Sequence, residues 1–323
     1  MCSEFDIIRQ YFTRPVTKAA LGVGDDAALI STTAEKELVI SVDTLVSGHH
    51  FFADTDPRQL GYKALAVNLS DMAAMGANPR WVTLALTLPR NLIQQNEAWL
   101  DEFAAGFFEL ADTYQIELIG GDTTRGPLNI SVQIIGEVEK GKALLRSGAR
   151  PGDDIWISGH LGDAALALAH EQQQINLNPA ELMQCLSALH APIARIELGR
   201  RLINLAHSVI DISDGLMADL EHIVESSNVS ATIYFNEIAC SSILRKFLPH
   251  PVAVSCLLAG GDDYELCFTA SERKQKEIEE LSLKLAISLT RIGRITQGKG
   301  LTVLNSDGTA ITQETKGYDH FRT

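Results

Sequence analysis

The chain has 323 residues, of which 46% are hydrophobic and 21% are charged, and its formal net charge is −14. The length predicts about two domains, and the composition is that of a globular protein that can bury real cores. An acidic balance of this size argues against a nucleic-acid partner and against an anionic membrane surface. No apolar run is long enough to span a bilayer, and the first residues lack the pattern of a signal peptide. The five cysteines are scattered without a CxxC pair, so we expect reduced thiols and a cytoplasmic protein.

Strand-like and helix-like segments alternate through the first half of the chain. Branched and aromatic residues predict the strands, and helical periodicity predicts the helices between them. The first helix begins at Pro57, which suits a first helical position, and ends at Gly76. The expected strands are 38–42, 81–88, 116–119 and 130–138, and the expected helices are 57–75 and 95–114.

A segment rich in Gly, Arg and Lys at residues 140–152 predicts the domain junction. A second series of elements follows it. The sequence therefore predicts an α/β (α+β) protein of two domains, 1–140 and 141–323. The expected strands of the second domain are 154–158, 208–212, 231–235, 264–269, 291–295 and 301–304, and its expected helices are 163–173, 192–206, 216–226 and 271–285.

The positions of the aspartates in the sequence predict a ligand site. Several follow apolar runs and stand beside glycine or another small residue, whereas surface acids usually lie on the polar faces of helices. In open α/β structures, ligands bind at the carboxyl ends of strands, where we expect these side chains to gather. The residues of this kind are Asp43, Asp122, Asp211, Asp214, Asp262 and Asp263.

Asp71 lies inside KALAVNLSDMAAMGA, a predicted helix whose other residues are nearly all apolar. Asn68 stands three residues earlier and therefore on the same face. A carboxylate in such surroundings is costly unless it is paired or coordinates a cation. Two interpretations stay open: Asp71 binds a metal ion, or it is a structural residue satisfied by backbone donors or by Lys63.

Together these acids point to hard divalent cations, because Mg²⁺ prefers carboxylate oxygens and shares its shell with substrate phosphates. The chain has no GxxxxGK[ST] loop, no GxSxG elbow and no zinc-like spacing. The loop LGVGDDAALI would repel a phosphate unless Asp25 or Asp26 holds a cation. The simplest function for these residues is metal-dependent phosphoryl transfer.

Motifs along nearly the whole chain match one family. They are SEFDII, GVGDDAAL, SVDTLVSGHHF, YKALAVNLSDMAAMGANP, LIGGDTTRG, RSGARPGD, SGHLGD, APIAR, DISDGL, AGGDDYELCF and KGYDHF. The chain resembles the thiamine-monophosphate kinases, within the superfamily of aminoimidazole ribonucleotide synthetase and selenophosphate synthetase. The resemblance implies two α/β domains, with the N-terminal domains of two subunits pairing through a shared β-barrel. It also implies that ATP passes its γ-phosphate directly to thiamine monophosphate, with several Mg²⁺ ions bridging the phosphates.

Carried over residue by residue, the resemblance also assigns the site. Two departures from the family stand out: Ala104 replaces a tyrosine that contacts the nucleotide in some relatives, and Asp262 replaces a glutamate. The implied metal residues are Asp26, Ser41, Val42 (by its backbone oxygen), Asp43, Asp71, Asp122, Asp211 and Asp214, the ATP contacts are Gly121, Asp122, Arg146 and Ser213, and the substrate contacts are His50, Asp262 and Tyr318.

Two other functions stay open at this point. One is a different ATP-using enzyme of the superfamily, such as a selenophosphate or aminoimidazole ribonucleotide synthetase, although Cys2 lacks the glycine-rich setting expected of a selenophosphate synthetase. The other is a nucleotide or thiamine sensor without turnover, which would have little reason to keep so many mutually repelling carboxylates. The terminal Tyr318 either stacks on a cationic thiamine ring or only packs.

Overall fold

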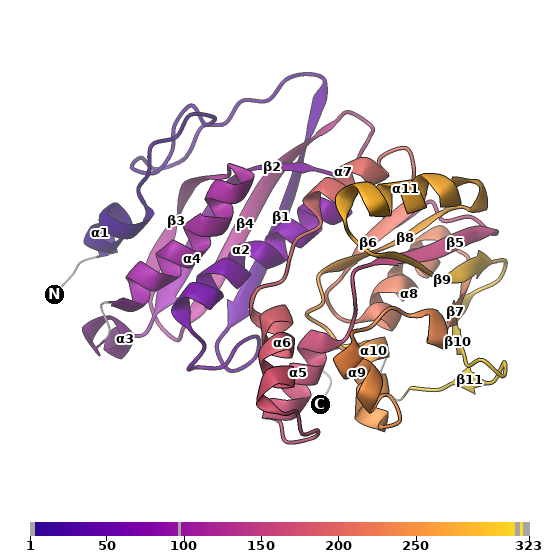
Figure 1. Ribbon diagram of the computed structural model, residues 1–323. Coiled ribbons are helices and arrows are strands. Elements are labelled where there is room, and N and C mark those ends of the chain that lie inside the picture. The colour runs from indigo at the N-terminus through magenta and orange to yellow at the C-terminus, as the bar shows by residue number, and fades with distance from the viewer. Residues whose placement is uncertain (1–3, 96–97, 314–316, 319–323) are drawn as a thin grey trace. The chain divides into compact units, whose positions relative to one another are not determined.

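The computed structural model describes residues 4–95, 98–313 and 317–318. The chain forms two compact units (Figure 1). The N-terminal unit consists of Met1–Met72 with Ala77–Gly141, and the C-terminal unit consists of Ala73–Gly76 with Lys142–Thr323.

The N-terminal unit is built on a four-stranded sheet in the order β1-β4-β2-β3. Strand β4 pairs antiparallel with β1 and β2, and β2 pairs parallel with β3. Helices α2 and α4 cover one face of this sheet (Figure 1). In chain order the elements are α1 (Glu4–Ile7), the π-helix η1 (Ile8–Phe12), β1 (Lys36–Val46), α2 (Pro57–Ala74), β2 (Asn78–Leu88), α3 (Arg90–Gln95), α4 (Ala98–Tyr114), β3 (Glu117–Arg125) and β4 (Asn129–Glu139).

Helix α2 has the boundaries that its sequence predicts. The Asp56 carboxylate accepts a hydrogen bond from the Gln59 N–H at 3.0 Å, Pro57 occupies the first helical position, and Gly76 follows the last turn with φ +66°. Most of its side chains are buried, which explains why apolar residues surround the helix on all sides.

The other face of the N-terminal sheet is only partly covered. Residues 4–35, the N-terminal arm, place Val16, Ala19, Ala28 and Ile30 against Trp81, Ile119 and Ile135 of the sheet. On the edge strand β1, three alternate apolar side chains of this face are exposed: Leu38 by 38%, Ile40 by 58% and Val42 by 60%.

The C-terminal unit has a seven-stranded sheet in the order β11-β10-β7-β9-β5-β8-β6. Only the β7–β10 pair is parallel. Its elements are β5 (Asp153–Ser158), α5 (Asp163–Glu171), α6 (Pro179–His190), α7 (Ile196–Leu202), β6 (Ser208–Ile212), α8 (Leu216–Ser227), β7 (Ser230–Tyr234), η2 (Phe235–Glu237), α9 (Ser242–Phe247), α10 (Pro251–Ala259), β8 (Glu265–Ser271), η3 (Glu272–Lys274), α11 (Gln275–Leu285), β9 (Leu289–Thr296), β10 (Gly300–Leu304) and β11 (Ala310–Ile311).

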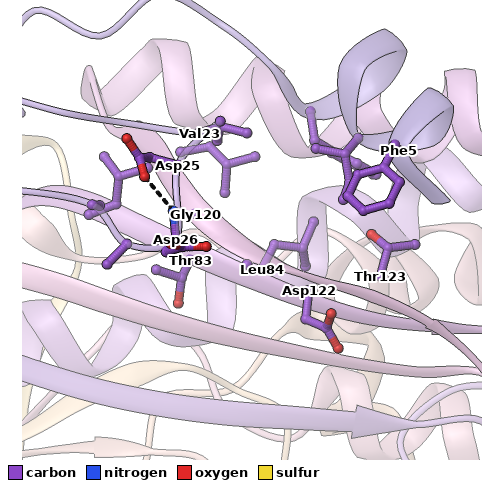
Figure 2. A pocket seen from close by; sticks show the side chains of 17 residues that line it. Phe5, Val23, Asp25, Asp26, Thr83, Leu84, Gly120, Asp122 and Thr123 are labelled. Atoms are coloured by element: carbon purple, nitrogen blue, oxygen red, sulfur yellow. Dashed lines mark hydrogen bonds between the residues drawn. The ribbon is translucent and has the colours of Figure 1, made fainter.

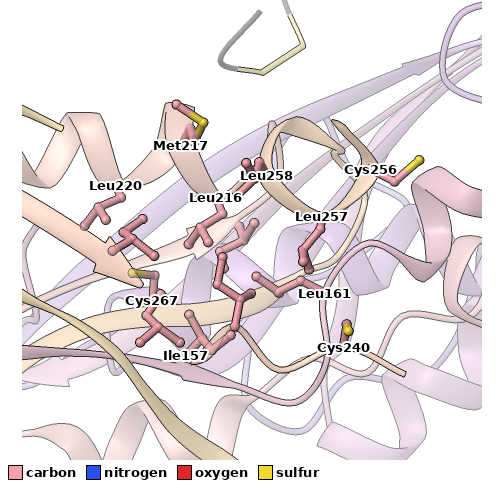
Figure 3. Packing of buried hydrophobic residues seen from close by; sticks show 14 of the residues in the cluster. Ile157, Leu161, Leu216, Met217, Leu220, Cys240, Cys256, Leu257, Leu258 and Cys267 are labelled. Atoms are coloured by element: carbon pink, nitrogen blue, oxygen red, sulfur yellow. The ribbon is translucent and has the colours of Figure 1, made fainter. Parts of the chain in front are cut away.

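The core of the C-terminal unit lies between this sheet and the helices α5, α8 and α10. Figure 3 shows Leu216 and Leu220 of α8 and Leu257 of α10 packed toward Ile157 of β5 and Cys267 of β8. Because side chains alternate along a strand, Trp156 points to the opposite face, where its ring stacks on Phe268 with centroids 6.3 Å apart.

Several predicted boundaries are wrong. The helix expected at 192–206 is limited to α7, and Pro192 precedes it in a non-helical segment. The helix expected at 95–114 is α4, which begins at Ala98, and the short helix α3 before it was not expected. Helix α6 was not expected, although Asn178 and Glu181 form a capping box that marks its start.

Within the described ranges, every helix is too short or too polar to cross a bilayer. The cysteines at 185, 240, 256 and 267 are buried free thiols. Cys2 lies outside the described residues, as do all but Gly317 and Tyr318 of the KGYDHF motif.

Candidate functional site

The N-terminal unit contains a pocket of about 540 Å³ between the arm and the sheet (Figure 2). Two of the predicted site segments, far apart in sequence, form opposite parts of its wall. The arm contributes the GDD loop, and β2 and β3 contribute the floor. The lining residues are Phe5, Ile8, Phe12, Val23, Gly24, Asp25, Asp26, Ala27, Ala28, Thr83, Leu84, Leu118, Ile119, Gly120, Gly121, Asp122 and Thr123.

The two adjacent aspartates of the arm differ in their hydrogen bonds. An oxygen of the Asp25 carboxylate accepts a hydrogen bond from the Asp26 N–H at 2.8 Å, which folds the loop on itself. The Asp26 side chain is exposed at the pocket wall and has no hydrogen-bond partner among the described residues. Asp25 therefore shapes the loop, and Asp26 is available to a ligand.

Gly121 and Asp122 lie within β3, not beyond its end as expected from the sequence. Strand β2 continues alongside them, so that Asp122 is opposite Ala85. A Cβ atom on Gly121 would stand 1.9 Å from the Leu84 carbonyl oxygen, so only glycine fits this close approach. Asp122 is an exposed residue at the pocket wall.

A second group of predicted residues gathers where β1 meets α2. The Ser41 hydroxyl donates a hydrogen bond to the Asp71 carboxylate at 2.5 Å, and Asp71 is half-buried. Asp43 is two residues further along β1 and therefore on the same face as Ser41, whereas Val42 faces the other way. Asp43 also lies inside its strand, not at the strand's end.

His50 and Ala104 stand apart from these groups. His50 lies in the turn after β1, where its Nδ1 accepts a hydrogen bond from the Val46 N–H at 3.1 Å. Ala104 is buried in α4 and is not among the residues that line the pocket.

In the C-terminal unit the DISDG segment forms the turn between β6 and α8. Asp211 is buried at the end of β6, and Ser213 and Asp214 follow in the turn. One oxygen of Asp219, in the first turn of α8, accepts hydrogen bonds from the backbone N–H groups of Ser213, Asp214 and Gly215 at 3.0, 3.1 and 3.1 Å. Asp219 was not singled out from the sequence, although its place in the first turn of a predicted helix is a capping signal.

Two further predicted residues lie against this turn. The Asp262 N–H donates to the Ser213 carbonyl oxygen at 2.9 Å, and the Tyr318 N–H donates to the Asp214 carbonyl oxygen at 3.0 Å. Asp262 has a left-handed φ of +67° and accepts a hydrogen bond from the hydroxyl of Tyr264, whose own φ is +50°. Such strained backbone is concentrated at ligand sites. The hydrogen bonds to the turn bring together Asp211, Ser213, Asp214, Asp262 and Tyr318.

Charge repulsion marks this turn. Burial, with the carboxylates of Asp211 and Asp214 close by, raises the pKa of Asp219 to about 7. Burial also raises the pKa of Asp263, which accepts a hydrogen bond from the Gly162 N–H at 2.8 Å. Arg146 lies in the loop before β5 and is exposed. Perturbed carboxylates held together in this way are typical of functional sites.

Among the described residues, no three His, Cys, Asp or Glu side chains stand close enough together to hold a metal ion by themselves. The predicted metal residues offer oxygen atoms alone, and in the N-terminal unit Ser41 and Asp71 already place two such oxygens 2.5 Å apart. This donor chemistry fits Mg²⁺, which proteins hold through one or two carboxylates together with waters and substrate phosphates.

Comparison with known proteins identifies the class. Residues 24–138 match the family model of the AIR synthase related protein N-terminal domain, and residues 150–304 match that of the C-terminal domain. The chain is 45% identical to the thiamine-monophosphate kinase of Escherichia coli K12 over all of this chain and 99% of that protein. It is 35% identical to the Bacillus subtilis thiamine-monophosphate kinase over 99% of both chains. The chain belongs to the thiamine-monophosphate kinase family.

Solved structures have the same fold. The thiamine-monophosphate kinase of Stenotrophomonas maltophilia K279a superposes with a TM-score of 0.83 at 48% identity, covering 91% of this chain and 92% of that one. AaThiL complexed with AMPPCP and TMP superposes with a TM-score of 0.78 at 31% identity, covering 93% of this chain and 92% of that one. The two-domain fold expected from the sequence is confirmed.

Proposed function

We propose that this chain transfers the γ-phosphate of ATP directly to thiamine monophosphate, forming thiamine diphosphate and ADP. The bond between the γ-phosphorus and its bridging oxygen breaks, and a new bond forms to a phosphate oxygen of thiamine monophosphate. That acceptor oxygen is already ionised near neutral pH, so no general base is required. What the protein must supply is in-line positioning and charge neutralisation. The observation that carries this proposal is that Asp26 and the Gly121–Asp122 pair line one pocket in a chain of this family.

The N-terminal unit, taken as residues 1–140, would bind nucleotide and metal. Gly121 lies at the pocket wall, where the phosphates would bind, and Asp26 and Asp122 would face them from the two sides of the pocket. The apolar side chains of Phe5, Ile8 and Phe12 give the same pocket a surface for the adenine ring in place of the tyrosine that Ala104 replaces.

Mg²⁺ would be held by the side chains of Asp26, Ser41, Asp43, Asp71, Asp122, Asp211 and Asp214 and the backbone oxygen of Val42, and when bound it would neutralise the phosphate oxygens. The short Ser41–Asp71 hydrogen bond and the repulsion around Asp219 support this assignment. Asp25 is left out because its carboxylate is used within the loop.

The C-terminal unit, taken as residues 141–323, would supply the remaining contacts. Arg146 and Ser213 would bind ATP, and Asp262 and Tyr318 would bind thiamine monophosphate together with His50 of the N-terminal unit. Backbone hydrogen bonds attach Asp262 and Tyr318 to the turn that carries Asp211 and Asp214. This attachment supports the arrangement, because it joins proposed substrate residues to proposed metal residues.

A homodimer formed through a shared β-barrel is part of the proposal. Strand β1 is at the edge of its sheet and exposes Leu38, Ile40 and Val42 on one face, an apolar surface that a second copy would cover. We also place the enzyme in the cytoplasm, which the four buried free thiols support.

One assay tests the reaction. Purified protein is incubated with ATP, Mg²⁺ and thiamine monophosphate, and the formation of thiamine diphosphate is followed. We expect one thiamine diphosphate for each ADP, with no product when Mg²⁺ is chelated. Failure to form thiamine diphosphate would contradict the proposal, as would turnover only with a different acceptor.

A further inference from the structure

Glu117, the first residue of β3, attaches the N-terminal arm to the sheet. Its carboxylate accepts hydrogen bonds from three consecutive backbone N–H groups about a hundred residues earlier: Thr17 at 2.6 Å, Lys18 at 2.8 Å and Ala19 at 2.9 Å. The Thr17 hydroxyl donates a fourth hydrogen bond at 2.8 Å. The Lys18 ammonium group donates to the carbonyl oxygen of Gln115, just before the strand. One carboxylate is thus enclosed by donors of the arm.

The hydrogen bonds favour the ionised form of this carboxylate. Partial burial raises the pKa of Glu117, but the bonds from Thr17, Ala19 and Lys18 outweigh it and leave the pKa below its usual range. Hydrogen bonds to an ionised acceptor are about twice as strong as neutral ones. The attachment therefore depends on the negative charge as well as on the shape of the side chain.

The attached segment leads directly into the pocket wall. Directly after Ala19, the chain forms a loop closed by backbone hydrogen bonds between Leu21 and Leu29. This loop carries Asp26, and residues 23–28 line the pocket. Beyond the loop, Ala28 and Ile30 make apolar contacts with the sheet, and the Thr32 hydroxyl donates one hydrogen bond of 3.3 Å to the Glu137 carboxylate of β4. Apolar contacts are not directional, so the several shorter hydrogen bonds to Glu117 contribute most to the register of the loop over β3.

We propose that Glu117 is a positioning residue for the nucleotide: by holding residues 17–19 it places Asp26 across the pocket from Gly121 and Asp122. Glu117 itself does not line the pocket. The inference rests on the proposed function, because it assumes that the pocket binds ATP.

Glu117→Gln is the main test. In the wild type the second carboxylate oxygen accepts hydrogen bonds from the N–H groups of Lys18 and Ala19. In the variant the amide oxygen can still accept from Thr17, but the amide NH₂ group replaces that second oxygen and cannot accept. We expect the KM for ATP to rise about tenfold, a loss comparable to that of one charge-assisted hydrogen bond. The KM for thiamine monophosphate should change less than about twofold by the same reasoning. Glu117→Ala should raise the KM for ATP further and should again leave the KM for thiamine monophosphate nearly unchanged.

Asp112→Asn is the matched control. Asp112 binds Arg14 of the same arm through an exposed ion pair at 3.0 Å, upstream of the loop. Exposed ion pairs contribute little, so both KM values should stay within about twofold of the wild type. Hydrogen exchange should be faster at the amides of residues 17–19 in Glu117→Gln and unchanged there in the control.

The outcomes separate the two proposals. If the wild type forms no thiamine diphosphate, the proposed function fails, and the role of Glu117 is then decided by calorimetric titration with the ATP analogue AMPPCP and Mg²⁺. An unchanged KM for ATP in Glu117→Gln would overturn the positioning role. An equal rise in both KM values together with a lower Tm would also overturn it, because it would show a purely structural residue.

Discussion

Glu117 in the N-terminal unit and Asp219 in the C-terminal unit each hold a backbone segment by accepting its hydrogen bonds. Each carboxylate accepts hydrogen bonds from three consecutive backbone N–H groups, and each of these segments leads to or carries proposed metal ligands. The two carboxylates differ in how far along the sequence their hydrogen-bond donors lie. Glu117 reaches residues 98 to 100 positions away, whereas Asp219 reaches residues four to six positions away, at the start of its own helix.

Their pKa values shift in opposite directions for a physical reason. Asp219 is buried beside two other carboxylates, and this raises its pKa to about 7 despite its hydrogen bonds. At Glu117 burial also raises the pKa, but the hydrogen bonds from Thr17, Lys18 and Ala19 together outweigh it and leave the pKa lowered. Three backbone donors can therefore bind a carboxylate whose pKa is raised by burial and neighbouring charge, or one whose pKa the hydrogen bonds themselves lower.

The largest effect on turnover is expected at a proposed metal ligand, in contrast to the supporting carboxylates Glu117 and Asp219. Asp71→Asn keeps the shape of the side chain and its contact with Ser41 but removes the charge. We expect turnover to fall by about 10²- to 10³-fold, as when one group that stabilises transition-state charge is lost. The thermal unfolding midpoint should hardly change. Near-normal activity at low Mg²⁺ would show that Asp71 is structural.

Asp219→Ala should affect both stability and turnover. It leaves three N–H groups of the DISDG turn without their acceptor, which we expect to lower the free energy of unfolding by about 2–4 kcal/mol. Displacement of Asp211 and Asp214 should slow turnover by roughly 10²-fold. Urea denaturation and steady-state kinetics measure the two effects. Asp219→Asn, which can still accept, is the control and should recover most of the stability.

Tyr318→Ala tests the segment that lies on the same turn. If its ring stacks on the cationic thiamine ring, the KM for thiamine monophosphate should rise by about 3- to 30-fold, the range of a cation–π contact. The KM for ATP should change far less. Equal changes in both constants, with a lowered Tm, would indicate a tail that only packs.

Acid should weaken the attachment of the arm to Glu117. Glu117 has a folded pKa below its usual value of 4.5, so its attachment is fully present above that pH and is lost as the pH falls through the lowered value. Lys18, the charged group beside it, stays protonated throughout. The indole NMR signal of Trp81, which lies under the arm, should report the change. In Glu117→Gln the signal should change less with pH than in the wild type. A dependence equal to that of the wild type would assign it to Glu137, whose pKa is also lowered and which pairs with Arg80 beside Trp81.

Much of the fold follows from local sequence. The apolar run with Pro57 at its start predicts α2, and branched residues predict β2 and β4. The ends of strands were less predictable. Strand β3 runs on through GGDTTR, whose polar residues show no alternation, because the neighbouring strand β2 supplies the ladder. Helix α7 ends at Leu202, and Asn204 follows it with a left-handed φ of +65°, a conformation in which helices commonly end.

The sequence by itself determined the kinds of side chain at the site and the family of the chain. Acidic residues beside glycines, and an Asp inside an apolar helix, are unusual enough to indicate cation-dependent chemistry without any coordinates. Only the tertiary structure decided which of these residues meet and what holds them. It paired Ser41 with Asp71, gave Asp25 a role inside its loop, and placed residues 17–19 on Glu117. Contacts between residues a hundred positions apart depend on how strands and loops pack, and no local pattern encodes them.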